Sequence, residues 1–112
     1  MIWFKKSLEN ALKNEDAVSL NVIGVRYLKG SDGFPKDKEM AIKCFTPAAK
    51  QGFPLSIIWL MQISIDDNDV KMVDYWMEEY KKCVKTDTII TSWINRLYKD
   101  FKEKANNDII NA

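Results

Sequence analysis

Apolar residues recur at helical spacing along almost the whole chain, and glycine or proline interrupts this pattern at only a few points. Residues three and four positions apart lie on one face of an α-helix, so the spacing predicts a series of helices that each bury one face. The chain holds only four Gly and three Pro, which leaves room for long uninterrupted helices. No convincing alternation typical of β-strands is found. We therefore predict an all-α fold.

Turn-forming residues divide the chain into about six helical segments. We predict these segments at 1–15, 17–29, 37–52, 55–65, 70–83 and 87–104. Residues 105–112 lack periodicity and are expected to fray. Asp37 and Asp87 are the predicted N-caps of the third and sixth segments, and Gly52 ends the third. Because the chain has only 112 residues, we expect one domain over residues 1–104.

The helical segments have predicted buried faces. The faces of the first, fifth and sixth segments consist of Phe4, Leu8, Ala11 and Leu12; of Val73, Trp76, Met77 and Tyr80; and of Ile90, Trp93, Leu97 and Phe101. The fourth segment is apolar nearly all round, so it should be the most buried helix or it should face a partner. Trp76 and Trp93 are interpreted as core residues, whereas Trp59 is either core or a binding anchor.

One specific motif runs through the second and third segments. The residues that form it are Leu20, Ile23, Gly24 and Tyr27, followed by Ala41 and Phe45, in the order of the tetratricopeptide pattern. A glycine such as Gly24 lets two antiparallel helices approach closely, and Tyr27 and Phe45 should fill the space beside it. The motif therefore predicts a helical hairpin.

The longer loop after Tyr27 makes the similarity more specific. The residues that agree in order are Ala17, Gly24, Tyr27, Gly30, Gly33, Pro35, Asp37, Ala41, Ala48, Ala49 and Gly52. Residues 17–52 thus resemble one Sel-one-like repeat, the long-loop relative of the tetratricopeptide repeat. The chain departs from that family in an extra residue between Gly30 and Gly33 and in Cys44, where an aromatic residue is usual. It also carries Pro47, which should kink the helix because proline has no backbone N–H.

This resemblance implies a short right-handed α-solenoid or helical bundle, built on tetratricopeptide-like hairpins and preceded by an N-terminal helix. Residues 54–84 would form a degenerate second hairpin, in which Leu60 and Trp76 take repeat positions but Met61 replaces the glycine. Residues 87–104 would then cap the stack with a polar outer face.

The sequence holds no pattern that predicts catalytic residues, a cofactor or a metal site. It contains no histidine, which removes the commonest general base and metal ligand. Cys44 and Cys83 lack the spacing of a metal site and are expected to be half-buried free thiols. No phosphate-binding glycine loop is found, and the acidic residues 66–69 have the wrong spacing for a calcium loop. We therefore predict that the protein is not an enzyme.

Charge and hydropathy limit the classes of partner. The net charge of +1 provides no global field to attract nucleic acid or an anionic membrane. The longest apolar stretch, residues 55–65, is too short to span a bilayer, and the N-terminal residues do not have the order of a secretory signal. We predict a cytoplasmic protein without a nucleic-acid or membrane partner.

A protein partner is the remaining prediction. The resemblance implies that the first helix of each hairpin carries the binding surface, which here comprises Val18, Asn21, Val25 and Lys29 together with Leu55, Ile58 and Gln62. Trp59 lies beside Ile58 and Gln62 and is the candidate anchor. An acidic cluster is a second candidate, consisting of Asp66, Asp67, Asp69, Asp74 and Glu78. Such a cluster can steer a basic partner, or it can simply be a solvated loop that runs into a helix start.

The most concrete functional hypothesis is a bacterial immunity or antitoxin protein that binds and neutralises a cognate toxin domain. Small size, the lack of catalytic groups and the acidic cluster favour it, because an inhibitor needs only a tight interface of about 800 Å² per partner. The alternative is a generic adaptor or assembly factor that binds its partner in a repeat groove. The apolar fourth segment and the tryptophan-rich second half are also compatible with a homodimer.

Overall fold

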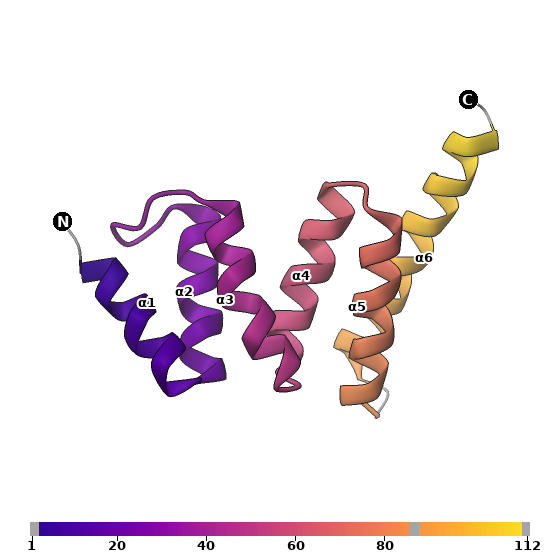
Figure 1. Ribbon diagram of the computed structural model, residues 1–112. Helices are drawn as coiled ribbons and strands as arrows, with labels where there is room; N and C mark the ends of the chain where they lie inside the picture. The colour runs from indigo at the N-terminus through magenta and orange to yellow at the C-terminus, as the bar shows by residue number, and fades with distance from the viewer. Residues whose placement is uncertain (1–2, 86–87, 111–112) are drawn as a thin grey trace. The chain divides into compact units, whose positions relative to one another are not determined.

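The computed structural model describes residues 3–85 and 88–110, and the predicted all-α class is confirmed for them, since they form helices and no strand. The helices labelled in Figure 1 are α1 (Trp3–Asn14), α2 (Ala17–Lys29), α3 (Lys38–Lys50), α4 (Pro54–Asp66), α5 (Val70–Cys83) and α6 (Ile89–Ile110). The chain divides into two compact units, residues 1–57 and 58–112, and α4 carries the division. Each unit is described by itself.

Aspartate side chains begin three of the helices. The carboxylates of Asp16, Asp37 and Asp69 accept hydrogen bonds from backbone N–H groups in the first turns of α2, α3 and α5. Such caps satisfy donors that the helix itself cannot pair, which explains why each helix starts where it does. The prediction of Asp37 as an N-cap is confirmed. The predicted cap Asp87 lies outside the described residues, and the hydroxyl of Thr88 accepts a bond of 3.1 Å from the Thr91 N–H.

The first unit is built around an antiparallel hairpin of α2 and α3 (Figure 1). Gly24 lies directly against the ring of Phe45, because a Cβ atom at Gly24 would stand only 2.6 Å from Phe45 Cε1. The predicted close approach of the two helices at this glycine is therefore confirmed. The buried residues of the two helices are Leu20, Asn21, Ile23, Gly24 and Tyr27 on α2, and Ala41, Cys44, Phe45, Ala48 and Ala49 on α3.

The loop between α2 and α3 is held by specific contacts. Gly30 ends α2 in the left-handed conformation (φ 67°), and a Cβ atom there would lie 2.8 Å from Lys36 Cβ. Phe34 is buried, and its ring meets the ring of Tyr27 edge to face with centroids 5.0 Å apart. The N–H of Asp37 donates to the Tyr27 carbonyl at 2.8 Å, so the loop returns the chain to α2 just before α3 begins.

Helix α3 continues through Pro47 to Lys50. One residue earlier, the hydroxyl of Thr46 donates to the Ile42 carbonyl at 2.6 Å, which gives that carbonyl a side-chain partner in this turn. Pro47 itself has no N–H to donate to the carbonyl four residues earlier, and the helix nonetheless continues past it. As predicted, the end comes at Gly52, which has φ 84° and follows the C-cap Gln51.

Helix α1 lies beside α2 in the first unit (Figure 1). Leu8 and Ala11 are buried, as predicted, but Leu12 is 44% exposed. The prediction for Leu12 is wrong, because residue 12 lies about 100° from residue 11 and about 40° from residue 8, at the edge of the buried face. The side chain of Phe4 lies outside the described residues.

Helix α4 contains more buried residues than any other described helix, which confirms the prediction from its apolar composition. These residues are Ser56, Ile57, Leu60, Met61, Ile63 and Ser64. The hydroxyl groups of the two buried serines each make a hydrogen bond, since Ser56 donates to Asn21 Oδ1 at 2.8 Å and Ser64 donates to the Leu60 carbonyl at 2.8 Å. Pro54 occupies the first helical position, where its missing N–H costs nothing.

In the second unit, α5 packs beside α6 (Figure 1). The predicted buried face of α5 is confirmed, with Val73, Trp76, Met77 and Tyr80 all at most 5% exposed. Asp74 on α5 accepts a hydrogen bond of 2.7 Å from the Tyr98 hydroxyl and forms an ion pair of 3.1 Å with Lys102. Both partners come from α6, so these three side chains tie the two helices together.

Helix α6 differs from the prediction in its buried face and its length. Ile94 is fully buried and Phe101 is 8% exposed, whereas Trp93 is 52% exposed and Ile90 is 54% exposed. The assignment of Trp93 and Ile90 to the core is therefore wrong, because the helix turns Ile94 inward instead. The helix also runs on to Ile110, although residues 105–112 were predicted to fray. No glycine or proline stands in that stretch to end it.

The two cysteines are free thiols in unlike environments. Cys44 is fully buried in the α2–α3 hairpin, and burial raises the pKa of its thiol to about 11. Cys83, at the end of α5, is exposed. The prediction of free thiols is confirmed, and the prediction that both are half-buried is wrong.

Candidate functional site

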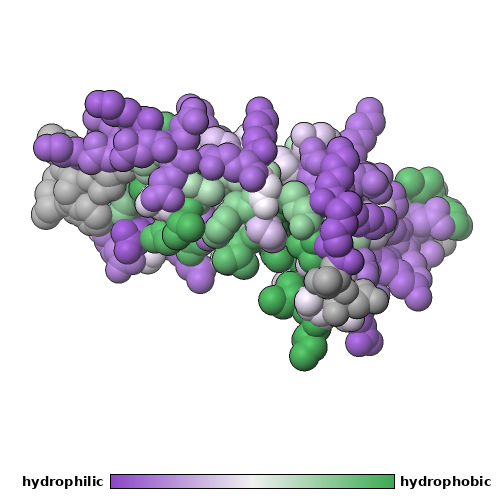
Figure 2. Space-filling model, turned by 90° about the horizontal axis from the view of Figure 1, so that it is seen from below, coloured by the Kyte–Doolittle hydropathy of each residue, from purple (hydrophilic) through white to green (hydrophobic). Residues whose placement is uncertain are grey.

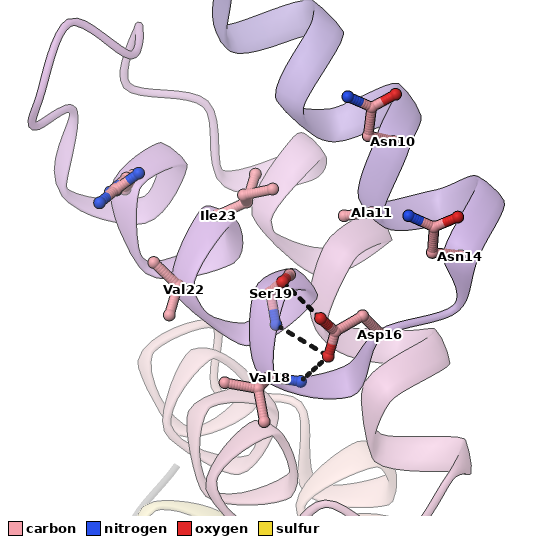
Figure 3. A pocket seen from close by; sticks show the side chains of 9 residues that line it. Asn10, Ala11, Asn14, Asp16, Val18, Ser19, Val22 and Ile23 are labelled. Atoms are coloured by element: carbon pink, nitrogen blue, oxygen red, sulfur yellow. Dashed lines mark hydrogen bonds between the residues drawn. The ribbon is translucent and has the colours of Figure 1, made fainter.

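An open groove lies between α1 and α2 in the first unit (Figure 3). Its volume is about 390 Å³, and the residues that line it are Asn10, Ala11, Asn14, Asp16, Val18, Ser19, Val22, Ile23 and Arg26. Ala11 and Ile23 are buried and form its floor. In the view of Figure 3, Asn10 and Asn14 project from α1, while Val18 and Val22 project from α2 on the other side. The groove therefore has one polar wall and one largely apolar wall.

The apolar wall is unusually open to solvent. Val18 is 58% exposed and Val22 is 42% exposed, and they stand four residues apart on the same face of α2. Figure 2 shows apolar surface, in green, between hydrophilic side chains on the side of the molecule where α2 begins. Burying such side chains against a partner stabilises the complex by roughly 25 cal/mol per Å² of apolar surface.

The polar groups of the groove fall into two kinds. Asp16 is engaged in capping, because its carboxylate accepts from the Val18 N–H at 3.1 Å and from the Ser19 hydroxyl at 2.7 Å. These bonds, that of the Ser19 hydroxyl above all, hold the pKa of Asp16 below its ordinary value. Asn10 and Asn14, in contrast, present exposed amide groups that can both donate and accept hydrogen bonds. Two such amides one turn apart suit a ligand that carries peptide groups.

Arg26 also lines the groove. Its Nε atom pairs with Asp32 Oδ2 at 3.3 Å, and its guanidinium lies 5.9 Å from the centroid of the Phe34 ring. Because both contacts come from the α2–α3 loop, the hairpin fixes the position of this cation at the groove. Both partners of the ion pair remain more than a third exposed, so solvent screens the pair and it contributes little to stability.

The predicted binding residues of α2 differ in how exposed they are. Val18 and Lys29 are exposed, as a binding surface requires, and Val25 is half-buried. Asn21 is only 8% exposed, and its Oδ1 atom accepts the hydrogen bond from Ser56. The prediction for Asn21 is therefore wrong, because this amide joins the starts of α2 and α4 inside the first unit.

The predicted binding residues of α4 are covered to different extents. Leu55 is 50% exposed. Ile58, Trp59 and Gln62 are half-buried, so neither the core interpretation nor the anchor interpretation of Trp59 is decided. The amide of Gln62 donates to Asp66 Oδ1 at 3.1 Å, which engages both side chains within the helix.

Several residues of the predicted acidic cluster make contacts within the protein. Asp69 caps α5 and Asp74 binds Tyr98 and Lys102, while Glu78 pairs with Lys81 at 3.7 Å. Asp66 and Asp67 are exposed at the end of α4. Members of the predicted cluster thus serve several roles in the fold.

Of the residues that line the groove, only Val18 was predicted to bind a partner, and four of the others stand in two pairs. They are Asn10 and Asn14 on α1, together with Val22 and Arg26 on α2. The spacing of each pair is four residues, which does place both members on one helix face. That signal was present, but it could not show which helix faces which.

No protein-family model matches this sequence, and no curated protein or solved structure is significantly similar to it. Within residues 3–85 and 88–110, no three His, Cys, Asp or Glu side chains are grouped as a metal site would require. Among the described helices, none combines the length and the apolar character needed to cross a membrane. The fold and the groove therefore carry the functional argument.

Proposed function

We propose that this protein is a non-enzymatic binding module that holds a segment of a partner protein in the groove between α1 and α2. The observation that supports this proposal is the pairing of exposed valines, Val18 and Val22, with exposed amides, Asn10 and Asn14, around one groove. An apolar side chain of the partner would cover the valines, while the amides would bond its backbone.

The α2–α3 hairpin supports the further proposal that residues 17–52 are a Sel-one-like repeat. Gly24 packs on Phe45, Gly30 takes the left-handed conformation, and the loop folds back through Phe34. Gly24, Gly30 and Phe45 stand at positions that carry the resemblance. On this proposal the binding groove lies on the first helix of the repeat, where the resemblance implies a partner surface.

Neutralisation of a toxin domain is the concrete form of the proposal. A small inhibitor needs one tight interface of about 800 Å² per partner, and it needs no chemistry of its own. The test is to mix the protein with the product of the gene adjacent to its own and to analyse the mixture by size-exclusion chromatography. Co-elution with loss of the toxin's activity supports this form. Separate elution contradicts it and leaves the adaptor alternative.

The groove itself can be tested without a known partner. A displayed library of short peptides is selected against the wild-type protein, and the affinities of the selected peptides are measured by fluorescence anisotropy. We expect Val22→Arg to weaken binding by at least about tenfold, because the cation and its stem fill the apolar wall. Leu12→Arg is the matched control, since Leu12 is 44% exposed, lies on α1 and does not line the groove.

Failure of the selection to enrich any peptide would contradict the proposal. Equal losses for Val22→Arg and Leu12→Arg would also contradict it, because they would place the effect outside the groove. Circular dichroism on both variants shows that each retains its helices.

A further inference from the structure

A second groove lies in the second unit, between the end of α4 and the last turns of α6. Its volume is about 360 Å³, and the residues that line it are Ile65, Asp66, Asn68, Leu97, Asp100, Phe101, Lys104 and Asp108. Phe101 is buried, whereas Ile65 and Leu97 are half-buried. These three side chains make an apolar floor, and the remaining residues, all exposed and polar, surround it.

The α6 wall of this groove follows one face of the helix. Leu97, Phe101, Lys104 and Asp108 stand at intervals of four, three and four residues, which is the spacing of a single helical stripe. At 1.5 Å per residue the stripe is about 16 Å long. The groove is therefore long enough for several residues of an extended or helical peptide, in addition to one buried side chain.

The charge around the floor is mainly negative. Asp66, Asp100 and Asp108 contribute carboxylates, and Lys104 is the one cation that lines the groove. Asp66 accepts a bond from the neutral amide of Gln62. Lys102, the nearby cation on α6, is committed to Asp74 on α5. Within the described residues, neither Asp100 nor Asp108 belongs to an ion pair or hydrogen bond of the fold.

Two of the carboxylates stand where a helix favours the opposite charge. Asp66 is the last residue of α4 and Asp108 lies in the last turn of α6, and neither last turn contains a basic residue. The C-terminal end of a helix carries partial negative charge, so carboxylates there repel it while cations are attracted. A cationic group bound in this groove would relieve both repulsions at once.

We propose that this groove binds a basic amphipathic segment of the partner protein, with an apolar side chain on the floor and lysine or arginine facing Asp66, Asp100 and Asp108. The inference rests on the proposed function, because it names the chemistry of a protein ligand. Complementary charge across the rim would speed encounter and select a basic partner, while the apolar floor would supply the buried contact.

The probe is a short labelled peptide with two leucines flanked by lysines, and its counterpart has glutamate at every lysine position. We expect the lysine peptide to bind and the glutamate peptide not to bind, and we expect the affinity to fall as salt is raised. The double variant Asp100→Asn with Asp108→Asn should lower the affinity for the lysine peptide by roughly five- to tenfold, since exposed charges each contribute modestly to binding. Glu103→Gln, an exposed α6 residue outside the groove, is the matched control and should change nothing.

Equal affinity for the two peptides, no binding of the lysine peptide, or an unchanged affinity in the double variant would each overturn this inference. The variant Val22→Arg separates it from the proposed function. If Val22→Arg abolishes binding of the lysine peptide and the double variant does not, the peptide occupies the α1–α2 groove. In that case this inference fails while the proposed function stands. The double variant could lose binding of the lysine peptide because it no longer folds, which its circular dichroism would show. In that case Asp100→Asn alone is tested, and the same outcomes apply.

Discussion

Gly24 and Phe45 set how closely α2 and α3 approach each other. Phe45 is fully buried, and its ring occupies the space where a Cβ atom at Gly24 would lie. We predict that Gly24→Ala destabilises the protein by about 1–3 kcal/mol, because the extra methyl group overpacks a filled site. Urea unfolding followed by circular dichroism measures this change. Combining Gly24→Ala with Phe45→Leu should recover part of the loss, and simple additivity of the two losses would contradict the packing argument.

The two thiols should react at very different rates. Cys83 is exposed, whereas burial raises the pKa of Cys44 to about 11, and only the thiolate reacts with thiol reagents. A chromogenic disulfide reagent at about pH 8 should therefore label Cys83 quickly and leave Cys44 unlabelled until denaturant is added. The variant Cys83→Ser should then show no fast phase. A fast phase that survives in this variant would mean that the α2–α3 hairpin opens readily in the native state.

Single residues also differ in how well the sequence predicts whether they are buried. The hairpin residues Gly24 and Phe45 were predicted correctly because their roles follow from size alone. Trp93 was placed in the core by its spacing, yet Ile94 is the buried residue. Two adjacent apolar residues fit the helical period almost equally well, and only the position of the neighbouring helix decides between them. The burial of Asn21 was not predicted for the same reason, since its hydrogen-bond partner Ser56 is far away in the sequence.

At the scale of helices, a charged cluster of Asp74, Tyr98 and Lys102 links α5 to α6. The hydrogen bond from Tyr98, supported by Lys102, holds the pKa of Asp74 below its ordinary value of 3.8. The same bond raises the pKa of Tyr98 to about 12 from an ordinary value of 10.0. Both shifts mean that the folded state favours a charged Asp74 beside a neutral Tyr98.

The sign of each shift fixes how stability depends on pH. Because the pKa of Asp74 is lower in the folded state, its contribution is present above pH 3.8 and is lost as the pH falls through the folded value. Because the pKa of Tyr98 is higher in the folded state, its contribution is present below pH 10.0 and is lost as the pH rises towards about 12. The Asp74 and Lys102 side chains are more than a third exposed, so the ion pair contributes at most about 1 kcal/mol.

We predict that Asp74→Asn lowers the stability of the second unit at neutral pH and flattens its loss of stability in acid. Urea midpoints measured from neutral pH down to about pH 2 test this, since the wild-type protein should lose its advantage over the variant in that range. Asp100→Asn is a suitable control, because Asp100 is exposed on α6 and makes no such contact with α5. A constant difference between wild type and Asp74→Asn at every pH would contradict the prediction.

The sequence predicted the helices better than their ends. Gly52 and the cap Asp37 are local signals, and both act as predicted. The end of α6 carries no such signal, and the helix continues to Ile110 instead of ending near residue 104. The lack of an apolar stripe does not exclude a helix, because a polar segment can continue a packed helix where no glycine or proline ends it.

At the scale of the whole molecule, the grooves depend on which helices are neighbours. The sequence predicted Val18 as a binding residue from the hairpin motif, but it could not predict that Asn10 and Asn14 of α1 face it. The second groove likewise joins the end of α4 to residues of α6 that are distant in the sequence. Periodicity defines the faces of each helix, whereas tertiary packing alone determines which faces meet.

The proposal that the groove between α1 and α2 binds a partner protein can be tested by NMR mapping of a selected peptide ligand on the isotope-labelled protein. We expect the largest amide shift changes on Asn10, Asn14, Val18 and Val22, and we expect Val22→Arg to remove them. Shift changes confined to helices other than α1 and α2, or unchanged by Val22→Arg, would contradict it.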